Sequence, residues 1–80
     1  MSEQAPIPFE LKKLIDVAND LELDVELRLH TIPMIGRFSS YEALVSLLDI
    51  ARNQKATYRE RDLALKTARE VLKVLASRRD

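Results

Sequence analysis

One stretch of this chain, residues 21–30, alternates strictly between apolar and polar side chains, which is the pattern of a half-buried β-strand. The leucine, glutamate and arginine residues that fill most of it are strong helix formers, however. No other segment of the 80 residues has a strand pattern, so a strand would have to pair with a second chain. Two structures therefore remain for this stretch: a helix capped by Asn19 and Glu22, which we favour, or a dimer-forming strand.

Residues 9–21 have the spacing of an amphipathic helix, because apolar side chains recur from Phe9 to Leu21 at three- and four-residue steps. Two prolines close the preceding segment, residues 1–8, and proline is well tolerated in the first turn of a helix. The chain is short enough for one domain only, and it contains no repeat. We therefore expect a flexible N-terminal tail over residues 1–8 and a single helical domain over residues 9–80.

Residues 31–39 are expected to form a connector, because Pro33 disfavours helix at the residue before it and Gly36 supplies a flexible joint. A capping box that begins at Ser39 then predicts a helix over about residues 40–53. Apolar side chains cover well over half of the wheel of this helix. A helix with so broad an apolar surface is covered on several sides, so we expect it to be the central element of the domain.

A second capping box, formed by Thr57 and Glu60, predicts a last helix over about residues 58–77. The apolar residues of this helix follow the spacing of a packing seam: Leu65, Ala68, Leu72 and Leu75. The link that precedes it is too short for anything but an antiparallel pair. The sequence thus predicts an all-α fold, a small three- to four-helix bundle whose central apolar helix at about 40–53 packs antiparallel on the helix at about 58–77.

Residues that commonly perform chemistry are scarce in this chain. It has no Cys, one His and one Gly, which excludes disulfides, thiolate metal sites and glycine-rich phosphate loops. A nucleophile–base relay would have to combine His30 with a serine, and no glycine-flanked turn presents one. The acidic residues Asp16, Asp20 and Asp24 lack the turn glycine and ligand spacing of a calcium loop. We therefore predict a protein that is not an enzyme and that has no catalytic residues, no metal and no cofactor.

The sequence does not predict a membrane segment. It has no run of 18 apolar residues, and its first residues lack the basic-then-apolar pattern of a signal peptide. We therefore expect a cytoplasmic protein with no membrane partner.

The 13 basic and 13 acidic residues give a formal net charge of zero, but they are unevenly distributed. Residues 1–50 carry four basic and nine acidic side chains, a net charge of −5, and residues 51–80 carry nine basic and four acidic, a net charge of +5. Four cations fall on one side of the last helix and form a basic stripe: Arg59, Lys66, Arg69 and Lys73. We expect this stripe to bind a protein partner with an acidic surface. Nucleic acid is a less favoured partner, because Asp62 interrupts the stripe and no aromatic residue lies within it.

Four apolar residues fall outside the predicted packing seams: Leu23 and Leu27 in the alternating stretch, and Leu63 and Val74 on the last helix. Single exposed leucines are common on protein surfaces. Several of them in so small a chain are better explained by a second chain that covers them. We therefore predict a partner or dimer interface at these four residues, and we expect a homodimer.

The segment Val25–His30, followed by two amphipathic helices, resembles the ribbon–helix–helix repressors. In that family an alternating strand pairs with its dimer mate and points its outward side chains into the major groove. The resemblance implies contacts to DNA from Arg28 and His30. The chain departs from the family in three respects: a helix precedes the segment, a long connector follows it, and Glu26 would face the DNA.

These observations predict a non-enzymatic, small regulatory or adaptor protein that binds another macromolecule through helical surfaces as a homodimer. The alternative is a DNA-binding transcriptional regulator with a ribbon–helix–helix-like intermolecular strand at residues 24–30. The conformation of that segment separates the two predictions.

Overall fold

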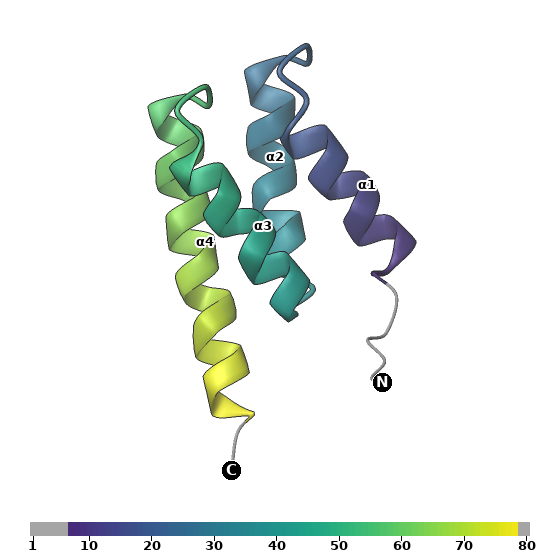
Figure 1. The fold of residues 1–80 in the computed structure, drawn as a ribbon, viewed down its shortest axis with the longest axis vertical. Coiled ribbons are helices and arrows are strands. Elements are labelled where there is room, and N and C mark those ends of the chain that lie inside the picture. Colours follow the sequence, from purple (N-terminus) through teal and green to yellow (C-terminus); the bar gives the residue numbers. More distant parts are fainter. Residues whose placement is uncertain (1–6, 79–80) are drawn as a thin grey trace.

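The computed structural model describes residues 7–78, which fold into four helices joined by short loops (Figure 1). The helices are α1 (Phe9–Ala18), α2 (Val25–Gly36), α3 (Tyr41–Arg52) and α4 (Tyr58–Ser77). No strand occurs in this part of the chain, and none of its helices is both long and apolar enough to cross a membrane. The predicted all-α fold is confirmed. Residues 1–6 of the predicted tail lie outside the described residues.

The alternating stretch of residues 21–30 contains no strand, and its second half belongs to a helix. The alternative of an intermolecular strand at residues 24–30 is therefore wrong. α2 begins at Val25, and Asp24 precedes it as the N-cap residue. In this conformation Leu29 and Ile32 reach the core of their own chain. The helix also satisfies its backbone hydrogen bonds internally. High helix propensity and burial therefore outweigh the alternating pattern.

The loop between α1 and α2 is capped differently from the prediction. Asn19 does not begin a helix but ends α1, where both its backbone N–H and its side-chain Nδ2 donate to the Ile15 carbonyl, the latter at 2.9 Å. The Asp20 carboxylate then accepts from the Glu22 N–H at 3.0 Å. Such local bonds from side chains to the backbone favour a turn over a helix. Leu21, which the apolar spacing assigns to the first helix, therefore lies in the loop.

α2 continues through Pro33, where the sequence predicts a connector. Proline inside a helix removes one backbone hydrogen bond and costs about 3 kcal/mol. Ile32 and Ile35, on either side of it, are fully buried, and burial of two such side chains contributes about 3–6 kcal/mol. The burial offsets the cost of the proline, and the predicted connector of residues 31–39 shrinks to residues 37–40.

The two predicted capping boxes have different outcomes. α3 is capped by Ser40 and not by Ser39: the Ser40 Oγ accepts from the Ala43 N–H at 3.1 Å, while Ser39 takes a left-handed conformation with a φ of 46°. The box that opens α4 is confirmed. Thr57 Oγ1 accepts from the Glu60 N–H at 3.2 Å, and the Glu60 carboxylate accepts from the Thr57 N–H at 2.7 Å. Side-chain caps thus satisfy backbone donors in the first turns of both helices.

The four helices share one apolar core. α3 lies antiparallel beside α4, as predicted, and it also contacts α1 and α2 (Figure 1). α2 packs between α1 and α4. The last residue of α2, Gly36, approaches α4 so closely that a Cβ at this position would overlap Thr67 Cγ2. The core side chains are Leu11, Ala18, Leu29, Ile32, Ile35, Ala43, Leu47, Ile50, Ala64, Ala68 and Val71.

Candidate functional site

A buried ion pair joins α2 to the first turn of α4. Arg28 Nε lies 2.7 Å from Glu60 Oε2, and Arg28 Nη2 donates to Glu60 Oε1 at 3.2 Å. The side chains are 8% and 1% exposed, respectively. Arg28 Nη1 also donates to the backbone carbonyl of Leu23 in the α1–α2 loop. Arg28, which the DNA-binding alternative requires at the surface, therefore points into the protein and connects three segments of it.

The surroundings of this pair keep both groups charged. The hydrogen bond to Glu60 raises the pKa of Arg28 above its ordinary value. Burial alone would raise the pKa of Glu60, but the hydrogen bonds that it accepts from Arg28 and Thr57 outweigh burial and leave this pKa below its ordinary value. Both groups are thus ionised at neutral pH, hydrogen-bonded and shielded from solvent. This is the environment of a structural link.

His30, the other residue of the DNA-binding alternative, is exposed on α2. It lines a groove of about 420 Å³ between α2 and α4, whose other lining side chains include Glu26, Pro33 and Arg59. The lining contains no serine. Across the described residues, no group of three or more His, Asp or Glu side chains is placed to hold a metal ion. The groove therefore combines charged and apolar groups without a nucleophile beside His30.

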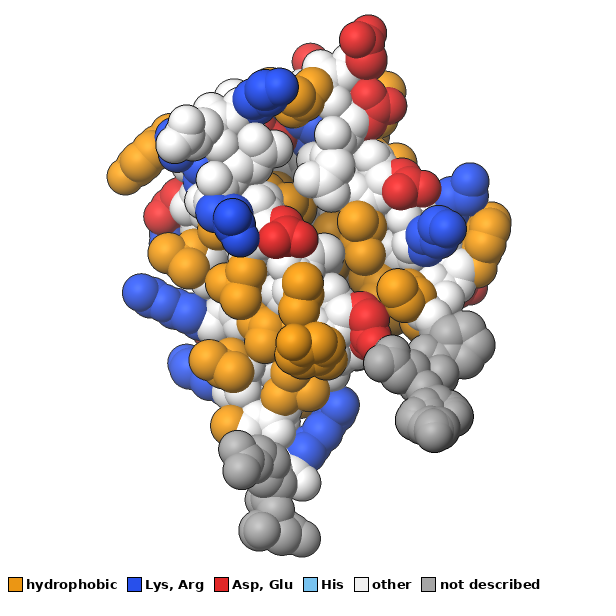
Figure 2. All heavy atoms as spheres, viewed as in Figure 1, with side chains coloured by type: hydrophobic (Ala, Val, Ile, Leu, Met, Phe, Trp, Pro, Cys, Tyr) orange, Lys and Arg blue, Asp and Glu red, His pale blue; other side chains and the backbone are white. Residues whose placement is uncertain are grey.

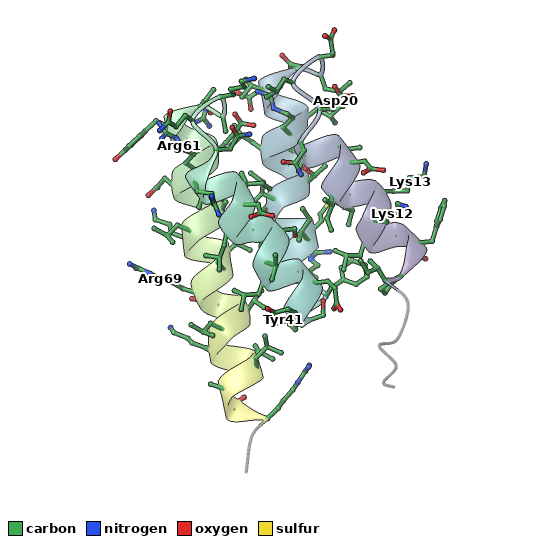
Figure 3. The ribbon with its side chains drawn as sticks, in the orientation of Figure 1. Lys12, Lys13, Asp20, Tyr41, Arg61 and Arg69 are labelled. Atoms are coloured by element: carbon green, nitrogen blue, oxygen red, sulfur yellow. The ribbon has the colours of Figure 1, made fainter. Side chains whose placement is uncertain are left out.

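The basic stripe lies on the exposed side of α4, and most of it is accompanied by acidic side chains. Three of its four cations lie beside a carboxylate: Arg59 with Glu26 at 3.4 Å, Lys66 with Asp62 at 3.3 Å, and Lys73 with Glu70 at 3.7 Å. Arg69 points away from the bundle (Figure 3) and makes no ion pair within residues 7–78. The stripe therefore carries its own counter-charges, which weaken its field.

The four apolar residues predicted at a partner or dimer interface differ in their exposure. Leu63 is half-buried on α4 and packs against the core, and Leu23 is half-buried in the α1–α2 loop. Leu27 on α2 and Val74 on α4 are exposed. Val74 lies about three turns beyond Leu63 along α4. Only two of the four, Leu27 and Val74, are thus exposed to a partner.

A different apolar surface forms where α3 and α4 lie side by side. α3 exposes Tyr41, Val45 and Leu48, and α4 exposes Leu65 and Leu72. The exposed fraction ranges from 38% for Val45 to 69% for Tyr41. Figure 2 shows the orange apolar side chains gathered over these two helices. We call this surface, defined by the five residues, the α3–α4 strip.

Two contacts fix how the two helices of the strip align. At one end, Arg78 Nη1 donates to the Ser39 carbonyl at 3.1 Å, so the Arg78 side chain reaches the start of α3 from the end of α4, which continues past α3 (Figure 1). Toward the other end, Ala51 of α3 and Leu65 of α4 line the same shallow pocket. The exposed apolar residues of the two helices therefore form one continuous face.

Charged side chains of opposite sign flank the strip. On one side, Glu42 and Asp49 line the groove between α1 and α3, and we call this pair the acidic margin. On the other side, Arg69 and Lys73 lie on the exposed side of α4, where they also line the groove toward α2, and we call them the basic margin. Asp62 lies on this side as well, in the pocket that Leu65 lines. Figure 2 shows blue side chains along the α4 edge of the orange area. The strip is thus an apolar band with carboxylates along its α3 edge and with the basic margin, interrupted by Asp62, along its α4 edge.

The strip is not evident from the sequence, because Leu65 and Leu72 share the spacing of the packing seam with buried neighbours. One feature of the sequence indicated an exposed apolar surface: the apolar side chains of residues 40–53 cover a wider arc of their helix than the neighbouring helices can bury. Of its apolar residues, only Ala43, Leu47 and Ile50 are fully buried.

Comparisons of the chain with protein-family models, curated proteins and solved structures found no match. We therefore infer its function from the geometry of the surfaces described above.

Proposed function

We propose that this protein is a non-enzymatic regulatory or adaptor protein that binds another protein through the α3–α4 strip. The observation that carries the proposal is that five large apolar side chains share one face of two adjacent helices. An isolated exposed leucine needs no explanation, but a continuous apolar surface favours association. Each Å² of apolar surface that a partner removes from water contributes about 25 cal/mol.

The arrangement of the strip matches the anatomy of protein interfaces. Such interfaces have an apolar centre and a polar rim, and tyrosine is enriched at their energetic centres. In this chain the charged margins lie outside the apolar residues, and Tyr41 is the most exposed member of the strip. The ridges of two parallel or antiparallel helices also suit docking by a further helix.

The charge distribution supports a protein partner over nucleic acid. Binding to the phosphate backbone depends on basic side chains that are free to neutralise it. In this chain three of the four cations of the basic stripe lie beside carboxylates, and the formal net charge is zero. Arg28, which the DNA-binding alternative assigns to base contacts, is paired with Glu60 in the interior.

The environments of the ionisable groups support a non-enzymatic role. A general acid or base must reach its substrate, whereas Arg28 and Glu60 are both buried and fully engaged with each other and with the backbone. His30 is accessible, but its groove has no serine that it could activate.

Capture experiments with strip variants test the proposal. Tagged wild-type protein, Leu48→Asp and Leu65→Asp are incubated with nuclease-treated extract of the source cells, and captured proteins are quantified by mass spectrometry. We expect each variant to capture at least about tenfold less partner, because a carboxylate in an apolar interface costs more than about 1.4 kcal/mol. Circular dichroism verifies that the variants remain helical.

The matched control is Leu27→Asp, which changes a leucine of similar exposure outside the strip (47% against 42% for Leu48 and Leu65). It should capture the partner as the wild type does. Capture that both strip variants retain would contradict the proposal. A parallel capture from untreated extract serves as the comparison: partners captured there by the wild type, and lost after nuclease treatment, would instead support the DNA-binding alternative.

A further inference from the structure

We infer that the α3–α4 strip binds a second copy of this chain, in a twofold-symmetric dimer whose axis runs along the two helices, so that α3 of each copy lies against α4 of the other. The inference rests on the proposed function, because it names the occupant of the same surface. It is supported by the dimensions of the face and by the charges on its two edges.

The size of the face suits a small twofold interface. α3 has 12 residues and α4 has 20, which correspond to about 18 Å and 30 Å of helix, and two adjacent helices are about 20 Å wide. The face thus offers about 500 Å² from each copy, or about 1,000 Å² in total, which is at the small end of specific interfaces. We therefore expect a dimer that dissociates in the micromolar range.

The charged margins make the face complementary to itself. A twofold axis along the helices places α3 of one copy opposite α4 of the other, so each acidic margin faces a basic margin. Arg69, which makes no ion pair in the described part of a single chain, would then gain an acidic neighbour.

The alignment of α3 with α4 sets which charges meet. The Arg78–Ser39 hydrogen bond and the shared pocket of Ala51 and Leu65 join the two helices at both ends of α3. A rotation about an axis along the helices keeps this alignment. The acidic margin, Glu42 and Asp49, therefore lies opposite the partner's basic margin, in which Arg69 makes no ion pair within the described residues of one chain.

The other twofold arrangement is disfavoured by the same charges. An axis across the helices, in the plane of the face, would place α3 against α3 and α4 against α4. Acidic margins would then face acidic margins, and basic margins would face basic margins. Like charges placed opposite each other suppress association, so the charges select the axis along the helices.

Sedimentation equilibrium of the full chain tests the inference, over concentrations from about 1 µM to about 500 µM that bracket a micromolar dissociation constant. We expect the wild type to change from its monomer mass of 9.2 kDa to twice that mass. Leu72→Asp, at a side chain that is 54% exposed in the strip, should remain monomeric. The control Leu27→Asp, at a side chain that is 47% exposed outside the strip, should dimerise as the wild type does.

Charge reversal tests the axis. Asp49 and Arg69 are both exposed, so their replacement is not expected to unfold the chain. Asp49→Lys and Arg69→Glu should each weaken the dimer about tenfold, and the double variant should return to within about threefold of the wild type, because the pair is restored in reverse. A dimer with α3 against α3 would instead not be weakened by Asp49→Lys, because no basic margin lies opposite this carboxylate.

Three results would overturn the inference, in different ways. A wild type that stays at 9.2 kDa at every concentration excludes the second copy, while the proposed function still depends on whether the strip variants capture less partner. A dimer that Leu72→Asp leaves intact, or that Leu27→Asp dissociates, excludes the α3–α4 strip as its interface. A dimer that Asp49→Lys tightens or leaves unchanged excludes the axis along the helices.

Discussion

α4 packs against α2 and against α3 in two different ways. On the α2 side the contact is specific at both ends, with the buried Arg28–Glu60 pair at one end and the close approach of Gly36 to Thr67 at the other. On the α3 side the contact is apolar, and it continues outward into the exposed α3–α4 strip.

The difference separates two roles of one helix. A buried ion pair and a close steric contact are each compatible with only one arrangement of two helices. The contact with α2 therefore determines the position of α4 in the fold. Apolar contact is not directional, and on the α3 side it leaves surface that a second protein can cover. If the contact with α2 determines the position of α4, substitutions at this contact should lower the free energy of unfolding.

The largest effect is expected at the buried pair. Glu60→Ala leaves the charge of Arg28 buried without its partner and removes the capping box of α4, so the free energy of unfolding should fall by about 3–5 kcal/mol. Urea unfolding followed by circular dichroism measures the change. The double variant Arg28→Ala/Glu60→Ala should lose less than the sum of the two single variants. A loss below about 1 kcal/mol for Glu60→Ala would indicate an ordinary surface pair.

A smaller effect is expected at the steric end of the α2–α4 contact. Gly36→Ala places a Cβ onto Thr67 Cγ2, so the free energy of unfolding should fall by about 1–2 kcal/mol despite the higher helix propensity of alanine. Thr67→Ser removes this methyl group and keeps the hydroxyl that donates to the Leu63 carbonyl. The double variant Gly36→Ala/Thr67→Ser should therefore be more stable in urea than Gly36→Ala. Equal stability of these two variants would argue against the steric explanation.

At acidic pH, protonation of the Glu60 carboxylate should weaken the contact between α2 and α4. The pKa of this carboxyl is lower in the folded chain than its ordinary value of 4.5. Its contribution to stability is therefore fully present above that value and is lost as the pH falls through the folded pKa. The loss should be smaller than that caused by Glu60→Ala, because a protonated carboxyl still fills its site.

Free energies of unfolding at about pH 7 and about pH 3 measure this dependence. Glu60→Gln provides the control, because an amide of similar volume does not titrate in this range. The difference between the two pH values should be smaller in Glu60→Gln than in the wild type. An equal difference would assign the acid sensitivity to other carboxylates.

The smallest effect is expected at the exposed pair that also joins α2 to α4. Arg59 Nη1 lies 3.4 Å from Glu26 Oε2, and the side chains are 72% and 60% exposed. Solvent screens such a pair, so Arg59→Ala should change the free energy of unfolding by less than about 1 kcal/mol in urea. A loss comparable to that of Glu60→Ala would remove the distinction between the buried and the exposed pair.

Short-range patterns predicted much of the fold. The capping box of Thr57 and Glu60 and the short link before it correctly predicted α4 and its antiparallel packing on α3. Both depend on residues within a few positions of each other, whose geometry the backbone largely dictates. The end of α1 and the path through Pro33 were predicted wrongly, because local turn bonds decided the first and burial of Ile32 and Ile35 decided the second.

The candidate site was less predictable. Arg28 and Glu60 are 32 positions apart, and no spacing rule relates them. Leu65 and Leu72 repeat with the same period as the buried Ala68, so the sequence alone does not separate the exposed residues from the buried one. The four cations of the basic stripe are exposed on α4, and the pairing of Arg59 with Glu26 depends on the position of α2.

Periodicity and capping were sufficient to make the chain helical, because they act over one or two turns of backbone. The packing of the four helices then decided which charges are buried and which apolar residues are exposed. Burial depends on how many neighbours surround a side chain, and these neighbours come from distant parts of the chain. An arginine and a glutamate therefore form a buried structural pair at Arg28 and Glu60, whereas the same two residue types form a solvent-exposed pair at Arg59 and Glu26.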